Sequence, residues 1–151
     1  MMERIDYRAL AELRYRIRVF MSFSETAARA RGIEPRQHQL LLAVKGLPDG
    51  VEPNVRVLAQ RLCLRHHSVV ELIDRLQARG LARRVQSRSD RRVALVSITA
   101  RGERLLRGLS VAHQTELRST GPALALALQA LLPPARAVRK GRTRAYGHKS
   151  S

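Results

Sequence analysis

The sequence has no tryptophan, a single cysteine and only 3% aromatic residues. One cysteine cannot form a disulfide within the chain, which excludes the disulfide-rich class of small secreted proteins and indicates a reducing compartment. This cysteine, Cys63, stands between Leu62 and Leu64, so we expect a small buried core residue. The alternative is a redox-sensing thiol, which the neighbouring Arg61 and Arg65 would activate if it were exposed.

Long apolar runs are missing as well. No stretch approaches the roughly 20 apolar residues that span a bilayer, and the charges scattered through residues 1–20 argue against a signal peptide. We therefore expect a soluble cytoplasmic protein with no membrane partner. A Gly-rich phosphate loop, paired inward carboxylates and a nucleophile with its base are also absent, so we expect neither an enzyme nor a cofactor.

Acidic residues are scarce. Twelve Asp plus Glu stand against 29 Lys plus Arg, which gives a formal net charge of +17. Such a charge attracts polyanions, and nucleic acid, an anionic membrane surface or an acidic protein would each respond to it. Most of the positive charge is arginine, whose planar fork suits phosphates and guanine edges. The position of the arginines must decide among these partners.

The first third of the chain predicts two helices. The 151 residues, 44% of them hydrophobic, suffice for one folded domain. Apolar residues recur every three or four positions from residue 5 to about residue 30, which is the spacing of one helix face. They are Ile5, Ala9, Leu13, Ile17, Phe20, Phe23 and Ala27. Gly32 should end this helix, Pro35 should begin a buried second one, and a loop should follow at residues 46–50.

The middle of the chain predicts a helix-turn-helix followed by a hairpin. Asn54 can cap a short helix, and residues 65–79 form a second helix that Gly80 ends. Helices joined by so short a turn are typical of a helix-turn-helix. The runs at 81–86 and 93–98 are rich in Val, Leu and Ile, and the arginine-rich segment between them predicts the tip of a β-hairpin.

Two closing helices are expected. Thr99 can cap the first of them, and Gly121 and Pro122 should end it. The last helix, near residues 123–132, is apolar almost all round and should therefore be buried, with a second copy of the chain as the expected partner. Residues 133–151 are basic and have no apolar period, which predicts a disordered tail.

The arginines lie where DNA would bind. Twelve of them fall between residues 54 and 104, against four acidic residues. A helix reads base edges in the major groove from its first turns, and a hairpin tip can insert a guanidinium into the adjacent minor groove. The helix candidates are Asn54, Arg56, Arg65, His66, His67, Ser68, Val70, Glu71 and Arg75. The hairpin candidates are Arg88, Arg91 and Arg92, with Asp90 placed to hold one of them in a fixed rotamer.

These features resemble the MarR family, the multiple-antibiotic-resistance regulators of bacteria and archaea. The resemblance covers most of the chain and rests on the segments VRVLAQRLCL, SVVELIDRLQARGLARR and SDRRVALVSITARGERLL. In the last of these, Asp90-x-Arg92 followed by Ile98-Thr99 and Gly102 is similar to the wing signature of the family. The resemblance implies a fold that is mainly α with a small β-hairpin wing.

The resemblance also implies a domain layout and partners. A MarR-like domain would cover residues 1–132, with dimerisation helices at 1–32 and 100–132, a winged helix-turn-helix at 35–99 and the basic tail after it. The 65–79 helix would enter the major groove of double-stranded DNA, and Arg92 the minor groove with support from Asp90. A small phenolic or other ligand would bind between the dimerisation helices and the DNA-binding lobe.

The sequence offers two other candidate sites, an effector pocket and a metal site. Tyr15, Phe20, Phe23 and His38 could line an effector pocket, although aromatic residues at helical spacing more often belong to the core. The adjacent histidines at 66 and 67 make a poor metal pair, because neighbours on a helix point about 100° apart. We expect no metal site.

The function predicted is that of a DNA-binding transcription regulator. In this prediction a homodimeric repressor binds a pseudo-palindromic operator and is relieved by a small ligand. One alternative is a nucleoid-type architectural protein that coats DNA without sequence preference. Another is an interaction module whose basic tail docks on acidic partners or RNA.

Overall fold

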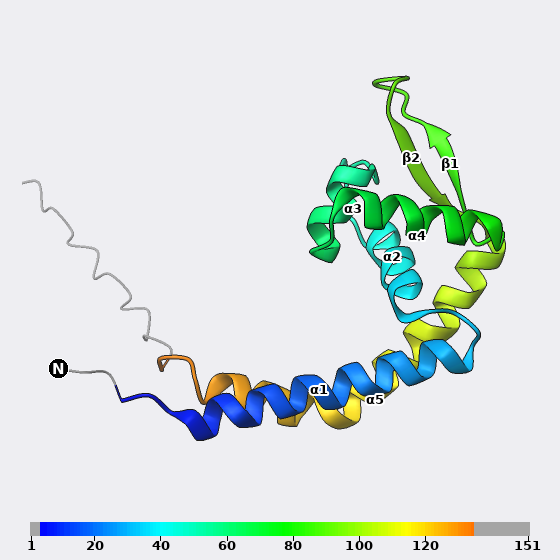
Figure 1. Cartoon of the computed structure of the whole chain (residues 1–151). Helices are drawn as coiled ribbons and strands as arrows, with labels where there is room; N and C mark the ends of the chain where they lie inside the picture. Colours follow the sequence, from blue (N-terminus) through cyan, green and yellow to red (C-terminus); the bar gives the residue numbers. More distant parts are fainter. Residues whose placement is uncertain (1–3, 135–151) are drawn as a thin grey trace, which may run out of the picture.

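The computed structural model describes residues 4–134 of the chain. Its elements are α1 (Tyr7–Ala30), α2 (Pro35–Lys45), α3 (Val55–Leu62), α4 (His66–Ala78), β1 (Ala82–Gln86), β2 (Ala94–Ile98) and α5 (Ala100–Gln129). Figure 1 shows a lobe of α2, α3, α4 and the hairpin, joined to a long arm in which α1 and α5 lie side by side. The predicted fold class, mainly α with a β-hairpin wing, is confirmed.

Local signals set the ends of α1 and α2. Asp6 caps α1, because its Oδ1 accepts a hydrogen bond from the backbone N–H of Ala9 at 2.9 Å. Gly32, with a φ of +73°, takes the left-handed conformation just after α1 that side chains disfavour. Pro35 occupies the first turn of α2, where its missing N–H costs nothing. The predicted end of the first helix and the predicted start of the second are therefore confirmed, whereas the first helix begins at Tyr7 rather than at Ile5.

The helix-turn-helix forms as predicted. The Oδ1 atom of Asn54 accepts a hydrogen bond from the backbone N–H of Val57 at 2.9 Å and so caps α3. After α4, Gly80 has a φ of +66°, as the predicted helix end requires. The inner faces of these helices close around one core together with α2, β2 and α5. Its fully buried side chains include Leu40, Leu41, Leu58, Val69, Ile73, Leu76 and Leu109.

The hairpin projects from the lobe, and a third segment joins it along the middle of β2. β1 and β2 pair antiparallel, with Ala82 opposite Ile98 and Gln86 opposite Ala94. The backbone N–H of Val96 donates a hydrogen bond to the carbonyl oxygen of Pro53 at 3.0 Å. The loop before α3 is therefore fastened to β2.

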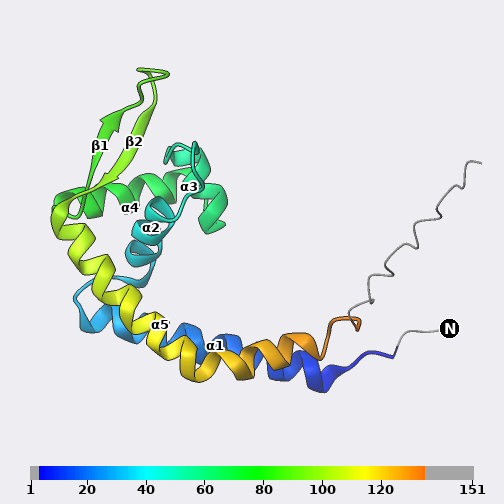
Figure 2. The same ribbon diagram turned by 180° about the vertical axis from the view of Figure 1, so that it is seen from behind.

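The prediction of two closing helices is wrong. Thr99 caps α5 as expected, its Oγ1 accepting from the N–H of Gly102 at 3.1 Å, but the helix continues through Gly121 and Pro122. A proline in a helix removes one backbone hydrogen bond and crowds the residue before it. Gly121 reduces that crowding because it has no Cβ, and packing of α5 along α1 outweighs the remaining cost (Figure 2).

Two further predictions concern regions beyond the lobe. Within residues 4–134, none of the helices is both long enough and apolar enough to cross a membrane. The predicted disordered tail, residues 133–151, lies outside the described residues from residue 135 onward.

Candidate nucleic-acid interface

The amino end of α4 is free to meet a ligand. Arg65 precedes the helix in an extended conformation and its side chain makes no capping hydrogen bond. Val69, Leu72, Ile73 and Leu76 are buried on one face. The opposite face exposes predicted DNA-binding residues, namely Arg65, His66, His67, Glu71 and Arg75, while Ser68 and Val70 are half-buried beside them. The amphipathic pattern of α4 thus turns its polar face outward.

The start of α3 offers fewer free groups for contact with DNA than the sequence predicts. Arg56 is exposed in its first turn. Asn54 is half-buried, and its side-chain oxygen is engaged in the cap of α3. The side chain of Asn54 is therefore partly committed to the fold, and its amide NH2 can still donate to an external group.

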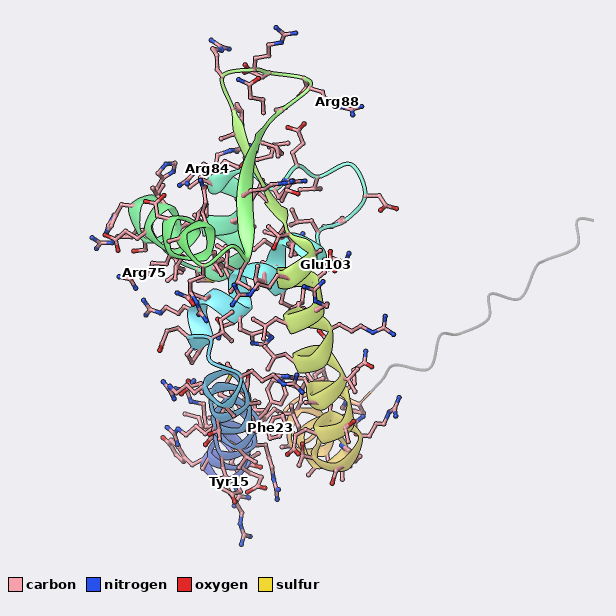
Figure 3. All side chains as sticks on the ribbon, turned by 90° about the vertical axis from the view of Figure 1, so that its right-hand side faces the viewer. Tyr15, Phe23, Arg75, Arg84, Arg88 and Glu103 are labelled. Carbon is pink, nitrogen blue, oxygen red and sulfur yellow. The ribbon has the colours of Figure 1, made fainter. Side chains whose placement is uncertain are left out.

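The tip of the hairpin presents three arginines. Arg88, Arg91 and Arg92 are exposed, and Figure 3 shows Arg88 at the free end of the hairpin. The side chain of Arg92 is 90% exposed but held at its base. Its Nε donates to Asp90 Oδ1 at 3.1 Å, and its Nη2 donates to Asp90 Oδ2 at 3.2 Å. This two-point contact orders the guanidinium while its outer edge stays open.

The contact between Asp90 and Arg92 is also an ion pair. Hydrogen bonds from the side chain and then the backbone N–H of Arg92 hold the pKa of Asp90 below its ordinary value. The predicted support of one arginine by Asp90 is thus present. It leaves a cation pointed away from the protein on a projecting hairpin.

Several other arginines of the lobe serve the fold instead. Arg84 donates to Asp74 Oδ1 at 2.6 Å and to Gln77 Oε1 at 3.0 Å, which ties β1 to α4 (Figure 3). Arg79 donates to Gln37 and to the backbone carbonyl of Gly32. Counting arginines in the sequence therefore overstates the number that can meet a polyanion.

The comparisons with known proteins bear directly on this lobe. Residues 31–93, from the end of α1 to the wing, match the sequence model of the MarR family. This match covers the helix-turn-helix lobe and less than half of the chain. Among curated protein sequences, none matches this chain.

Solved structures share the fold, and some of them are MarR-family transcription regulators. Apo MarR from Escherichia coli is 18% identical, with a TM-score of 0.65, and the match covers 87% of this chain and 100% of that one. AbsC from Streptomyces coelicolor is 18% identical, with a TM-score of 0.64 and coverage of 88% and 86%. CouR from Rhodococcus jostii RHA1, solved with p-coumaroyl-CoA bound, is 24% identical, with a TM-score of 0.58 and coverage of 74% and 82%.

The predicted effector residues are only partly brought together. Phe20 and Phe23 of α1 and His38 of α2 surround His113 of α5, with ring centroids 5.9, 5.5 and 5.0 Å from that of His113. Tyr15 is 54% exposed on the arm and does not join them (Figure 3). The cluster lies where the arm meets the lobe.

His113 is not among the effector residues predicted from the sequence. Its Nδ1 lies 2.6 Å from the carbonyl oxygen of Leu109, and its Nε2 lies 2.7 Å from Ser24 Oγ. A carbonyl can only accept, so Nδ1 carries a proton and donates it to Leu109. The available signal was a polar residue four positions after Leu109 and four before Leu117, on the apolar stripe of the helix.

His38 should make the protein less stable in mild acid. It is 3% exposed, and its Nδ1 is buried without a hydrogen-bond partner within the described residues. Burial, and then the neighbouring His113, lower the pKa of His38 from its ordinary value of 6.5. The unfolded chain therefore binds a proton at a pH where native His38 stays neutral. The free energy of unfolding should fall as the pH drops below about 6.5, by at most about 1.4 kcal/mol per pH unit for one proton.

Urea denaturation of the wild type and His38→Leu, between about pH 5 and pH 7, measures this dependence. The variant should depend less on pH than the wild type, because the buried group that titrates is gone. The matched control is His67→Leu, which makes the same substitution at an exposed histidine. Equal slopes for the wild type and His38→Leu would contradict the prediction.

The environment of Cys63 differs from the prediction. The prediction of a buried core residue is wrong, since Cys63 is exposed. It forms the turn between α3 and α4 in a left-handed conformation with a φ of +53°, while Leu62 and Leu64 pack against the core on either side of it.

Within residues 4–134, the structure contains no group of three or more His, Cys, Asp or Glu side chains that could hold a metal ion.

Proposed function

We propose that this chain is a transcription regulator of the MarR family, a homodimeric repressor that binds a pseudo-palindromic operator in the cytoplasm and is relieved by a small ligand. The half-sites would lie about one helical turn apart, roughly 34 Å. The observation that carries the proposal is the pair of cationic elements on one lobe, the amino end of α4 and the wing tip with Arg92 held by Asp90.

Each element suits one groove of duplex DNA. The exposed first turns of α4 fit the major groove, where Arg65 and His67 would contact base edges or phosphates. The wing is narrow and carries an ordered guanidinium at its end, which suits the negative potential of the adjacent minor groove. Sequence preference would come from α4, and much of the affinity from the wing.

The exposed apolar surface of α1 and α5 supports the proposed homodimer. Eleven large apolar side chains on α1, on α5 and next to their outer ends are exposed, and exposed apolar surface of this extent is typical of an interface. They are Ile5, Tyr7, Leu10, Tyr15, Ile17, Met21, Val111, Leu117, Leu126, Leu128 and Leu132. A groove of about 540 Å³ lies between the start of α1 and the end of α5, with Ala9, Ala123 and Leu126 in its lining. These outer ends lie far from the lobe, so a partner bound there would leave both wings free (Figure 1).

The proposed ligand would act at the junction of arm and lobe. Phe20, Phe23 and His38 meet there, and CouR, a protein of the same fold, has been solved with p-coumaroyl-CoA bound. A ligand releases DNA only if it binds better to a dimer whose α4 helices are misplaced for the operator. We propose a small organic ligand with an aromatic group, because aromatic rings form the cluster.

Replacing Arg92 by alanine should lower the affinity for the operator about 10-fold or more at fixed salt, because the wing loses its ordered guanidinium. Fluorescence anisotropy with an operator duplex selected from genomic fragments measures this. The control is Arg18→Ala, which removes the same charge from an exposed position on α1. Thermal unfolding of both variants should match the wild type. An Arg92→Ala protein that binds as tightly as Arg18→Ala would remove the wing from the mechanism.

A nucleoid-type protein that coats DNA without sequence preference is the second candidate. The net charge of +17 favours it, since charge alone supports binding to any duplex. Competition with random duplex DNA separates the two candidates. A specific repressor keeps its operator in excess random DNA, whereas a coating protein is displaced in proportion to the competitor.

A further inference from the structure

Glu52 connects the loop before α3 to the tip of the wing. Its Oε1 accepts a hydrogen bond from Ser87 Oγ at 2.9 Å and another from Ser89 Oγ at 3.2 Å. The two hydroxyl oxygens lie 2.9 Å from each other. One carboxylate thus holds two residues of the segment that joins β1 and β2.

Ser87 connects Glu52 to the backbone of the hairpin tip. It is only 1% exposed, and its Oγ also accepts from the backbone N–H of Ser89 at 3.2 Å and of Asp90 at 3.3 Å. Its own N–H donates to the carbonyl oxygen of Val93 at 3.0 Å, across the neck of the tip. A buried hydroxyl with this many partners fixes the turn around it.

The chain of hydrogen bonds ends at the proposed DNA contact. Ser87 holds the backbone of Asp90, and the Asp90 carboxylate holds the guanidinium of Arg92. The path therefore runs from Glu52 through Ser87 and Asp90 to Arg92. Moving the first member should change where the last one points.

The other end of the path is anchored in the helix-turn-helix. The residue after Glu52, Pro53, accepts from the N–H of Val96 in β2, and Asn54 both pairs with Leu95 and caps α3. A hairpin of two strands is marginally stable by itself. Glu52 supplies a brace from outside the hairpin, at the end that the helices do not reach.

The charge of Glu52 is opposite to what a surface that binds DNA requires. A carboxylate beside the phosphate backbone repels it, so electrostatics alone predicts that removing Glu52 strengthens binding. A carboxylate in this place is understandable if its hydrogen bonds contribute more than its charge costs.

We propose that Glu52 is a positioning residue for DNA binding, which acts through Ser87 and Asp90 to set the direction of Arg92. The proposal rests on the proposed DNA-binding function of the wing. Glu52 itself does not touch DNA. Its role is to keep the wing tip at one angle to α4, so that both elements meet the duplex together.

The test compares Glu52→Ala, Glu52→Gln and Asp49→Ala for operator affinity at fixed salt. Glu52→Ala should weaken binding about 10-fold, although it removes a negative charge, because the brace is lost. Glu52→Gln keeps an oxygen that accepts from both serines and should restore most of the affinity. The matched control, Asp49→Ala, removes a carboxylate from the same exposed loop and should leave binding equal or slightly tighter. Tighter binding by Glu52→Ala would overturn the proposal.

A double-mutant cycle with Arg92→Ala adds a readout that general loss of structure does not produce. If Glu52 acts through Arg92, Glu52→Ala should have little further effect once Arg92 is gone, whereas independent action would give additive losses and contradict the proposal. NMR order parameters of residues 88–92 in the free protein should fall in Glu52→Ala and recover in Glu52→Gln. If Glu52→Ala fails to fold, Ser89→Ala removes one donor from an exposed residue and should give a smaller loss of the same kind.

The two proposals fail in different ways. Arg92→Ala without effect would reject the proposed role of the wing, and Glu52 would then have nothing to position. A large loss in Arg92→Ala together with wild-type affinity in Glu52→Ala would reject the brace alone.

Discussion

Replacing Gly102 by alanine should destabilise the protein by about 3 kcal/mol and lower its melting temperature by about 10 °C. Gly102 is buried in the first turn of α5, where the helix crosses the start of β1. A Cβ built there would overlap the carbonyl oxygen of Leu81 and lie 2.7 Å from Ile98 Cγ2. The Leu81 carbonyl also accepts from the backbone N–H of Thr99 at 3.2 Å, so it cannot move aside without losing that bond.

The matched control for this substitution is Gly108→Ala, six residues along the same helix. Its Cβ would meet the guanidinium of Arg31, which is the free end of a flexible side chain and can shift. Alanine also favours a helix by about 1 kcal/mol over glycine. Calorimetry should therefore show a change of at most about 1 kcal/mol for Gly108→Ala. A Gly102→Ala protein as stable as this control would show that the crossing is looser than the distances indicate.

Much of the fold could be predicted because its boundaries are set by local chemistry. Asn54 and Thr99 cap helices, because their side-chain oxygens accept hydrogen bonds from the N–H groups three residues later. Gly32 and Gly80 end helices in a conformation that other residues avoid. Each of these signals is complete within a few residues of sequence, so no knowledge of the tertiary structure was needed.

The errors arose where tertiary structure outweighs a local rule. Pro122 normally ends a helix, but α5 lies along α1 and keeps its course through the proline. Cys63 has apolar neighbours on both sides, and a turn with positive φ nevertheless exposes it. In both places the deciding partner is distant in sequence or depends on a backbone angle that the residue types do not specify.

The candidate site shows the same division. The position of the arginine-rich tip and the pairing of Asp90 with Arg92 follow from residues two positions apart. The role of Arg84 as an internal tie, and the brace from Glu52 to Ser87, need contacts across 10 and 35 residues. A count of charges along the chain contains neither of these contacts.

Replacing Leu126 by glutamate should convert the proposed dimer to monomers and weaken operator binding by about 100-fold or more, because two linked half-site contacts become one. Leu126 is 66% exposed in the single chain and lines the groove between the ends of α1 and α5. Glutamate is a good helix former, so the protomer should keep its fold. In a dimer, by contrast, the substitution would bury an unpaired charge at an apolar interface.

Light scattering after size exclusion should give the mass of two chains for the wild type and of one chain for Leu126→Glu. The matched control is Leu42→Glu, the same change at an exposed leucine of α2 in the lobe, which should remain dimeric and bind the operator. Because both variants add one negative charge, a difference between them reflects position rather than charge. A Leu126→Glu protein that still elutes with the mass of two chains would place the interface elsewhere. A wild type with the mass of one chain at working concentrations would reject the homodimer itself.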